Sequence, residues 1–462
     1  MSRESLLVKN TAIFAVGNLG SKLLVLLLLP FCTYYINPSG MGYYDLLYSI
    51  LEVLKPIAVL AIPESLFRWL LDKGANVRSV FASWTTMFLV LVGIFSVLYA
   101  VIWFVVGFSD ALIMYLLVLT GVCYMSLQFA TRGLHNNKLF ALQGIVYSLV
   151  LCLSSLLYVI PLRLDYFGLL LGILTGNVVA CVLMTVTQWR SLGFSFSERN
   201  REIRNQMFKY SALLLPNTIC WWLVNSFGRV IVTFFLGAAA NGIFAIAGRF
   251  PMALNMVSSI FQQAWTEQAV GEFDSDDRDQ YFTKIFHLYS KLILSLAIVL
   301  IPFTKLFIDL FLEASYSEAC NYIGLLYLGS AICSFSSFFG TSYLCGKDTK
   351  GAATTTVFGA IVNCVVGIAL VIPFGINGVA IGMVVSQATI WLIRVRQSNS
   401  FFSITIDWKW IIAGVGFCLV LAIVTPFMDD FAAAIALICC VVIAVLFNRE
   451  IISSIFARFK KA

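Results

Sequence analysis

Fourteen long apolar stretches, separated by short loops, constrain this chain more than any other feature. A helix needs about 20 apolar residues to cross the roughly 30 Å of hydrocarbon in a bilayer. The segments that reach or approach this length are 10–36, 43–67, 80–107, 111–131, 139–160, 166–189, 210–236, 241–268, 285–312, 319–344, 352–374, 377–393, 408–427 and 431–447. The sequence therefore predicts an all-α integral membrane protein of about 14 transmembrane helices.

The Lys and Arg residues lie in alternate loops, which sets the orientation of the chain. Arg163 is the one basic residue that falls in a predicted outer loop. The loops and termini on the other side carry Arg3, Lys9, Arg68, Lys73, Arg78, Arg132, Lys138, Arg190, Arg199, Arg201, Arg204, Lys209, Arg278, Lys284, Lys347, Lys350, Arg394, Arg396, Lys409, Arg449, Arg458, Lys460 and Lys461. We expect cytoplasmic N- and C-termini, and the net charge of +7 then reflects topology and gives no reason to expect nucleic-acid binding.

The remaining composition argues against an enzyme or a cofactor-binding protein. The 12 cysteines lie mostly within predicted spans, without the spacing of metal ligands, and are interpreted as small buried residues. Each predicted outer loop has only about three to seven residues, and no hydrolase or metal motif is present. We therefore expect no enzyme activity and no cofactor, and a membrane polysaccharide polymerase or ligase is the remote alternative.

An internal repeat with a period of roughly 200 to 210 residues indicates a duplicated six-helix lobe. Its markers are Gly42 and Gly242, Ile160-Pro161 and Ile372-Pro373, and the rows Gly168, Gly172, Gly176 and Gly378, Gly382, Ser386. Small residues at this spacing let helices approach closely. We predict two parallel-repeat lobes around a central cavity. Their expected limits are an N-lobe at 1–190, a basic cytoplasmic linker at 191–209, a C-lobe at 210–396, and two last helices with a basic tail at 397–462.

Ionisable residues inside predicted spans carry most of the functional information, because charges in hydrocarbon are costly and usually face a cavity. The cations are Lys22, Lys55, Arg229, Arg249 and Lys291, which we predict to bind an anionic pyrophosphate or sugar substrate. The acids are Glu52 and Glu64, which are candidates for proton coupling. Glu52 lies three residues before Lys55 on the same helix face, so these two could neutralise each other. Structural ion pairs or snorkelling at helix ends are the alternative roles.

Arg229 and Arg249 are predicted at similar depth in neighbouring antiparallel helices and together could hold one multivalent anion. A planar guanidinium donates two parallel hydrogen bonds to phosphate oxygens, and a low dielectric strengthens the attraction. Aromatic residues could stack on sugar faces, although they are more often core or interface residues. The aromatic candidates are Tyr147, Trp221, Trp222 and Trp265.

Several stretches resemble the polysaccharide flippase family of the multidrug, oligosaccharidyl-lipid and polysaccharide exporter superfamily. They are Gly17-Asn18-Leu19-Gly20-Ser21-Lys22, Tyr210-Ser211-Ala212-Leu213-Leu214-Leu215-Pro216-Asn217, Arg229, Leu236-Gly237, Gly242-Ile243-Phe244, Asn363, Ile372-Pro373 and Gly375-Ile376-Asn377-Gly378-Val379-Ala380. The resemblance implies transport of undecaprenyl-diphosphate-linked oligosaccharides, such as O-antigen units of lipopolysaccharide, across the bacterial inner membrane by alternating access. The chain departs from the family at Gly228, where an Asp commonly precedes the Arg.

The resemblance also limits the partners and the alternatives. It implies a lipid-linked oligosaccharide substrate, contact with membrane lipids, and a polysaccharide polymerase and chain-length protein as candidate partners. A peptidoglycan lipid-precursor flippase would handle a similar pyrophosphate and stays open as an alternative. A multidrug or cation antiporter of the same superfamily is the other alternative, but it would be expected to place a carboxylate deep in the first or seventh span, and this chain has none there.

Overall fold

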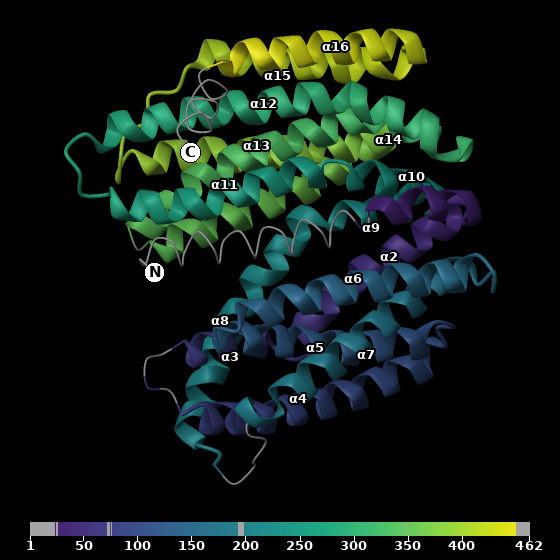
Figure 1. The fold of residues 1–462 in the computed structure, drawn as a ribbon, viewed down its shortest axis with the longest axis vertical. Coiled ribbons are helices and arrows are strands. Elements are labelled where there is room, and N and C mark those ends of the chain that lie inside the picture. Colours follow the sequence, from purple (N-terminus) through teal and green to yellow (C-terminus); the bar gives the residue numbers. More distant parts are fainter. Residues whose placement is uncertain are drawn as a thin grey trace. The chain divides into compact units, whose positions relative to one another are not determined.

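The computed structural model describes residues 24, 26–71, 74, 76–192, 198–346 and 348–449, which form helices and no strand (Figure 1). This confirms the predicted all-α class. The helices are α2 (Pro38–Ala58), α3 (Ile62–Leu70), α4 (Val77–Val106), α5 (Ala111–Gly133), α6 (Asn137–Val159), α7 (Asp165–Leu192), α8 (Arg201–Asn225), α9 (Phe227–Leu236), α10 (Ala238–Arg249), α11 (Met252–Gly271), α12 (Arg278–Phe311), η1 (Ala314–Ala319), α13 (Cys320–Cys345), α14 (Thr349–Ser398), α15 (Trp408–Val424), η2 (Thr425–Phe427) and α16 (Asp430–Phe447).

Several predicted spans are broken helices. In the described residues nine helices are long and apolar enough to cross a membrane, or up to 12 if each bent pair counts as one span. The pairs are α2 with α3, bent by 60°, α8 with α9, bent by 49°, and α10 with α11, bent by 42°. The predicted span 10–36 lies largely outside the described residues, so the number 14 stays a prediction.

The long helix α14 contains two antiparallel halves, because Gly375 at its centre has non-helical dihedrals of φ 58° and ψ −136°. Only glycine adopts such a conformation at low cost. The Ser386 hydroxyl of the second half donates to the Gly359 carbonyl of the first half at 2.7 Å. The two halves match the separate predicted spans 352–374 and 377–393.

The chain divides into two compact units, which are described separately below. Unit 1 comprises Met1–Ile36 and Tyr43–Trp222, and unit 2 comprises Asn37–Gly42 and Leu223–Ala462. The first turn of α2 therefore belongs to unit 2, and most of α8 belongs to unit 1. Within unit 1 the main contacts join α7 to α5 and α6, and α3 to α5. Within unit 2, α13 packs on α14, and α12 packs on α15 and α16.

Both predicted rows of small residues lie where helices touch, which confirms their packing role. In unit 1 a methyl group at Gly172 of α7 would overlap the Ser155 hydroxyl of α6. In unit 2 a methyl group at Gly378 would overlap the Leu370 carbonyl oxygen of the other half of α14. Without a hydrophobic driving force between helices in lipid, such close backbone approach supplies much of the packing energy.

The repeated glycines Gly42 and Gly242 pack against each other in unit 2. A methyl group at Gly42 would overlap the Ala238 carbonyl oxygen, and one at Gly242 would overlap the Pro38 carbonyl oxygen. Beside them the buried Asn241 side chain donates to the Gly42 carbonyl at 2.7 Å. The first turns of α2 and α10 are therefore in direct backbone contact.

Arg394 was predicted to lie in a cytoplasmic loop, and this prediction is wrong. It lies inside the second half of α14 and is only 6% exposed. Its guanidinium donates to the Ser336 carbonyl of α13 at 3.0 Å and lies within 3.5 Å of the Thr355 and Thr356 hydroxyls of the first half of α14. Satisfied hydrogen bonds make burial of this charge tolerable and join three helical segments.

We expect Gly242→Ala to destabilise the protein, whereas Gly248→Ala on the same helix should not. The added methyl group at Gly242 has no room against backbone atoms of α2, and overpacking typically costs about 1–3 kcal/mol. Gly248 has nothing within 4 Å of the added carbon, so alanine there should be neutral or slightly stabilising. Thermal unfolding of the two variants in detergent tests this. Equal melting temperatures would contradict the tight contact.

Candidate functional site

The residues predicted to bind substrate or couple protons are spread over several helices. Lys22 lies outside the described residues. In unit 1, Glu52 and Lys55 are on α2, and Glu64 is in the first turn of α3. In unit 2, Arg229 is on α9, Arg249 ends α10, and Lys291 is on α12. The structure brings together only some of these residues.

Glu52 and Lys55 form an ion pair, as their spacing indicates. The Lys55 ammonium lies 2.7 Å from Glu52 Oε1, and the two side chains are 19% and 38% exposed. The stem of Lys55 packs against α5, where a methyl group at Gly121 would lie 2.8 Å from Lys55 Cδ. A carboxylate at this distance cancels much of the charge that Lys55 could offer to an anion.

Polar and aromatic side chains of α5, α6 and α7 add to this region of unit 1. Tyr147, a candidate for sugar stacking, instead stacks on Tyr124 with ring centres 4.8 Å apart. Gln128 donates to the Tyr124 hydroxyl at 2.8 Å, and Asn177 donates to the Thr120 hydroxyl at 3.3 Å. Polar groups inside a membrane protein need such partners.

Glu64 follows the break between α2 and α3. Leu60 and Ala61 at this break both have positive φ values of 48° and 54°, which is uncommon for residues other than glycine. The Ala61 amide donates to the Pro56 carbonyl at 2.9 Å and so satisfies one carbonyl left free by the bend. Glu64 is half-buried and forms no ion pair within the described residues. It is therefore better placed than Glu52 to change its protonation state.

Arg229 lies just after the break between α8 and α9. The Asn363 side chain, from the first half of α14, donates to the Leu223 and Val224 carbonyls at 3.0 and 3.2 Å and satisfies them where the helix stops. The adjacent Gly228 is closely packed, since a methyl group there would lie 3.0 Å from Val379 Cγ1. An aspartate at this position, common in the family, would have to displace Val379.

Arg249 lies at the end of α10, which begins at Ala238 directly after the turn at Gly237. Because α10 begins earlier than the predicted span, Arg249 lies about one helical turn, or about 5.4 Å, further from this turn than Arg229 does. Both arginines are half-buried. They remain candidates for a shared anion, at slightly different depths.

The tryptophans considered for sugar stacking have structural contacts. Trp265 is 3% exposed, stacks on Phe338 with ring centres 4.2 Å apart, and donates to the Phe338 carbonyl. Trp222 donates to the Ser49 carbonyl at 2.8 Å. Trp221 is 37% exposed. The core interpretation therefore holds for Trp265.

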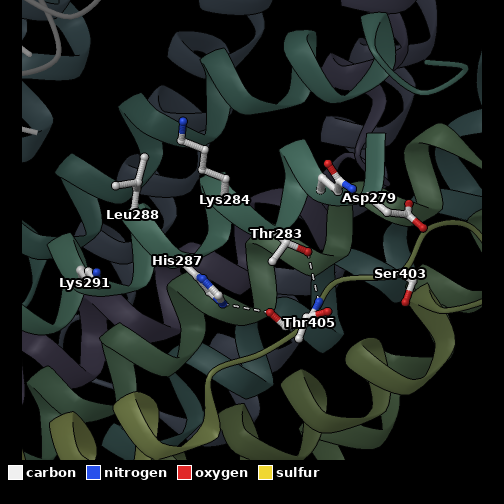
Figure 2. Close-up of a pocket in the computed structure, with 9 residues that line it drawn as sticks. Asp279, Thr283, Lys284, His287, Leu288, Lys291, Ser403 and Thr405 are labelled. Atoms are coloured by element: carbon white, nitrogen blue, oxygen red, sulfur yellow. Dashed lines mark hydrogen bonds between the residues drawn. The ribbon is translucent and has the colours of Figure 1, made fainter. Parts of the chain in front are cut away.

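Lys291 lines a polar pocket on the first half of α12 (Figure 2), together with basic residues that sequence reasoning did not select. The pocket has a volume of about 530 Å³. It is lined by Asp279, Gln280, Thr283, Lys284, His287, Leu288, Lys291, Ser403 and Thr405. Lys284, His287 and Lys291 lie at positions i, i+3 and i+7 and therefore share one helix face. This spacing is visible in the sequence, but the predicted span begins at residue 285 and so leaves Lys284 in a loop.

No group of His, Cys, Asp or Glu side chains in the described part of the chain is arranged to hold a metal ion. The charged side chains described above offer electrostatic attraction and hydrogen bonds. Cations on α9, α10 and α12 suit an anionic ligand, and the carboxyl group of Glu64 suits a proton.

The fold matches those of solved membrane transporters. The lipid II flippase MurJ, in an inward closed conformation, matches with a TM-score of 0.68 and 14% identity over 98% of this chain and 100% of that chain. An inward-facing multidrug resistance MATE family transporter of the MOP superfamily matches with a TM-score of 0.60 and 14% identity, over 82% of this chain and 94% of that one. A MOP superfamily transporter from Pyrococcus furiosus, whose binding pocket is described as reversed in polarity, matches with a TM-score of 0.55 and 11% identity. The match covers 85% of this chain and 94% of that one.

Sequence comparison gives a more specific result. The family model described as "Polysaccharide biosynthesis protein" matches residues 7–266, which is more than half of the chain. No curated protein sequence matches this chain. The family match and the fold together confirm the resemblance noted from the motifs.

The ion pair on α2 should show strong coupling between its members. We expect Glu52→Gln and Lys55→Met each to leave an unpaired charge in the span, so that the double variant is more stable than the two single effects predict, by about 1 kcal/mol or more. Thermal unfolding in detergent gives the melting temperatures of the wild type, the two single variants and the double variant. Glu64→Gln combined with Lys55→Met is the control and should be additive. Additivity of the Glu52 and Lys55 variants would mean that the pair is not formed.

Proposed function

The chain belongs to the polysaccharide biosynthesis protein family, and from this premise we propose that it is a flippase for undecaprenyl-diphosphate-linked oligosaccharide repeat units. It moves them from the cytoplasmic to the outer leaflet of the bacterial inner membrane by alternating access, for biosynthesis of a cell-surface polysaccharide. The family match over residues 7–266 carries this proposal, and the transporter fold supports it.

The proposed substrate suits the charges within the spans. A pyrophosphate carries several oxygens, each able to accept hydrogen bonds from the guanidinium groups of Arg229 and Arg249. Lys55 contributes less, because Glu52 lies 2.7 Å from its ammonium group. Lys22, which lies outside the described residues, is retained as a further candidate cation. On the outer side, a polymerase and a chain-length protein would consume the saccharide after it has crossed.

A peptidoglycan lipid precursor is the second candidate substrate. The likeness to the lipid II flippase MurJ extends over 98% of this chain, whereas the likeness to the MATE transporter extends over 82%. Lipid II also presents a polyprenyl pyrophosphate, so the same arginines would suit it. The two candidates differ in the saccharide, and a transport assay must therefore offer both.

Replacing Arg229 or Arg249 by Ala should reduce flipping of lipid-linked saccharide by about tenfold or more, because a charge-assisted hydrogen bond contributes about 1.5–3 kcal/mol. Replacement by Lys should preserve part of the activity, since the charge remains but the bidentate geometry does not. Proteoliposomes containing a fluorescent undecaprenyl-diphosphate oligosaccharide, and separately lipid II, report the rate.

The exposed Arg396 at the end of α14 provides the matched control, and Arg396→Ala should transport normally. Full transport by both Ala variants at normal protein level would remove Arg229 and Arg249 from the substrate site. Faster transport of lipid II than of the oligosaccharide would favour the second candidate.

Transport should respond to the membrane potential and, through Glu64, to a pH gradient. An inside-negative potential favours outward movement of a negative headgroup by about 2.3 kcal/mol per charge for each 100 mV. A half-buried carboxyl without an ion-pair partner among the described residues can cycle between charged and neutral forms. Potential and pH gradient are imposed separately on proteoliposomes with wild type and Glu64→Gln. The variant should lose only the pH response, and a rate indifferent to both gradients would leave a facilitated flippase.

A further inference from the structure

The pocket on α12 has the composition of an anion-binding site. Lys284 and Lys291 line it, and neither forms an ion pair with a carboxylate within the described residues. Asp279 is the one acidic residue among the lining residues that the structure describes. Two cations and one acid give the pocket an excess of positive charge.

The walls of the pocket come from two segments that are held together by hydrogen bonds. Figure 2 shows His287 and Thr283 of α12 directed toward Thr405, which lies in the connection before α15. His287 Nε2 lies 2.9 Å from the Thr405 carbonyl oxygen, so it is the protonated ring nitrogen that donates. The Thr405 amide donates to the Thr283 hydroxyl at 3.1 Å. These two hydrogen bonds hold Thr405 against α12, and they leave the ammonium groups of Lys284 and Lys291 able to bind an anion.

The opposite face of α12 anchors this arrangement in the core of unit 2. Phe282, Phe286 and Tyr289 are at most 1% exposed, and Phe286 and Tyr289 pack against Phe338 of α13. Because these residues lie on the face of α12 opposite Lys284 and Lys291, their packing on α13 directs the basic face of α12 away from α13. The pocket therefore stays on the outer side of the helix packing in unit 2.

The pocket lies at the edge of the hydrocarbon if the C-terminal part of α12 is the part that crosses the membrane. The helix has 34 residues and is about 50 Å long, more than a bilayer core requires. Residues 292–311 alone have the length that crosses about 30 Å. Lys291 comes directly before them, and Lys284 lies about two turns further out. Lysines at this level meet lipid headgroups.

We propose that this pocket binds the phosphate of an anionic phospholipid headgroup in the leaflet that the positive-inside bias marks as cytoplasmic. Lys284 and Lys291 pair with the phosphate oxygens, and the neutral groups of Gln280 and Ser403 complete its hydrogen bonds. The bound headgroup bridges α12 and the connection to α15 and stabilises their contact. This proposal assigns Lys291 to a lipid site in place of the saccharide substrate predicted for it from the sequence. The lipid site does not depend on which substrate is transported.

The test measures binding of phosphatidylglycerol to the full-length protein in neutral detergent, by native mass spectrometry and by the rise in melting temperature. Phosphatidylcholine serves as the zwitterionic comparison and inorganic phosphate as the soluble source of the same oxyanion. For wild type we expect binding of phosphatidylglycerol, little binding of phosphatidylcholine, and no competition by millimolar phosphate. Competition by phosphate at the affinity of the lipid would overturn the lipid assignment.

Substitution of the lysines provides the second arm. The double variant Lys284→Gln with Lys291→Gln should bind phosphatidylglycerol about thirtyfold more weakly, since each lysine near an anionic surface contributes about fivefold. The double variant Lys284→Arg with Lys291→Arg should retain binding, which separates loss of charge from misfolding. Lys350→Gln, an exposed lysine at the start of α14, is the matched control. Binding that is unchanged in the Gln variant, or equal for both lipids, would refute the proposal.

Discussion

The fold depends on close approach of helix backbones at small residues. In lipid the hydrocarbon chains are as apolar as leucine side chains, so helices gain little from hiding apolar surface against each other. Dispersion contacts must replace that gain, and they require surfaces that meet without gaps. The glycines of α7 on α6, of one half of α14 on the other, and of α2 on α10 provide these surfaces. Each contact lies within one compact unit.

Several spans are broken into two helices, and charged residues that we consider functional lie next to the breaks. Glu64 follows the bend between α2 and α3, and Arg229 follows the one between α8 and α9. A bend frees backbone carbonyls that cannot remain unpaired in a membrane. The Ala61 amide and the Asn363 side chain supply the missing hydrogen bonds. Irregular backbone is therefore stable at these points, where charged side chains enter the spans.

Sequence reasoning recovered the features that depend on composition and short-range spacing. The all-α class followed from apolar length, the Glu52–Lys55 pair from a separation of three residues, and the packing role of Gly172 and Gly378 from their repeated spacing. Features that depend on where a helix ends were less accessible. Hydropathy began the ninth span at residue 285, whereas α12 begins at Arg278. The first turns of α12 therefore include Lys284 and His287, and Lys291 stays a predicted ligand for an anion.

Three-dimensional contacts explain the other differences. Arg394 is a charged residue near the end of an apolar span, so the sequence places it in a loop. Only the contact of α13 with both halves of α14 shows that it is buried. The bends of the spans also escaped prediction, because Leu60 and Ala61 have no sequence signal for positive φ. The predicted residues Glu64 and Arg229 lie in the first turns of α3 and α9, and Arg249 is the last residue of α10.

The hydrogen bonds of Arg394 determine how the junction of α13 with α14 responds to pH. A guanidinium keeps its proton under all physiological conditions, and its hydrogen-bond acceptors here are a carbonyl and two threonine hydroxyls. None of these groups gains or loses a proton between acid and mildly alkaline conditions. These hydrogen bonds between α13 and the two halves of α14 are therefore the same in acid and in mildly alkaline solution.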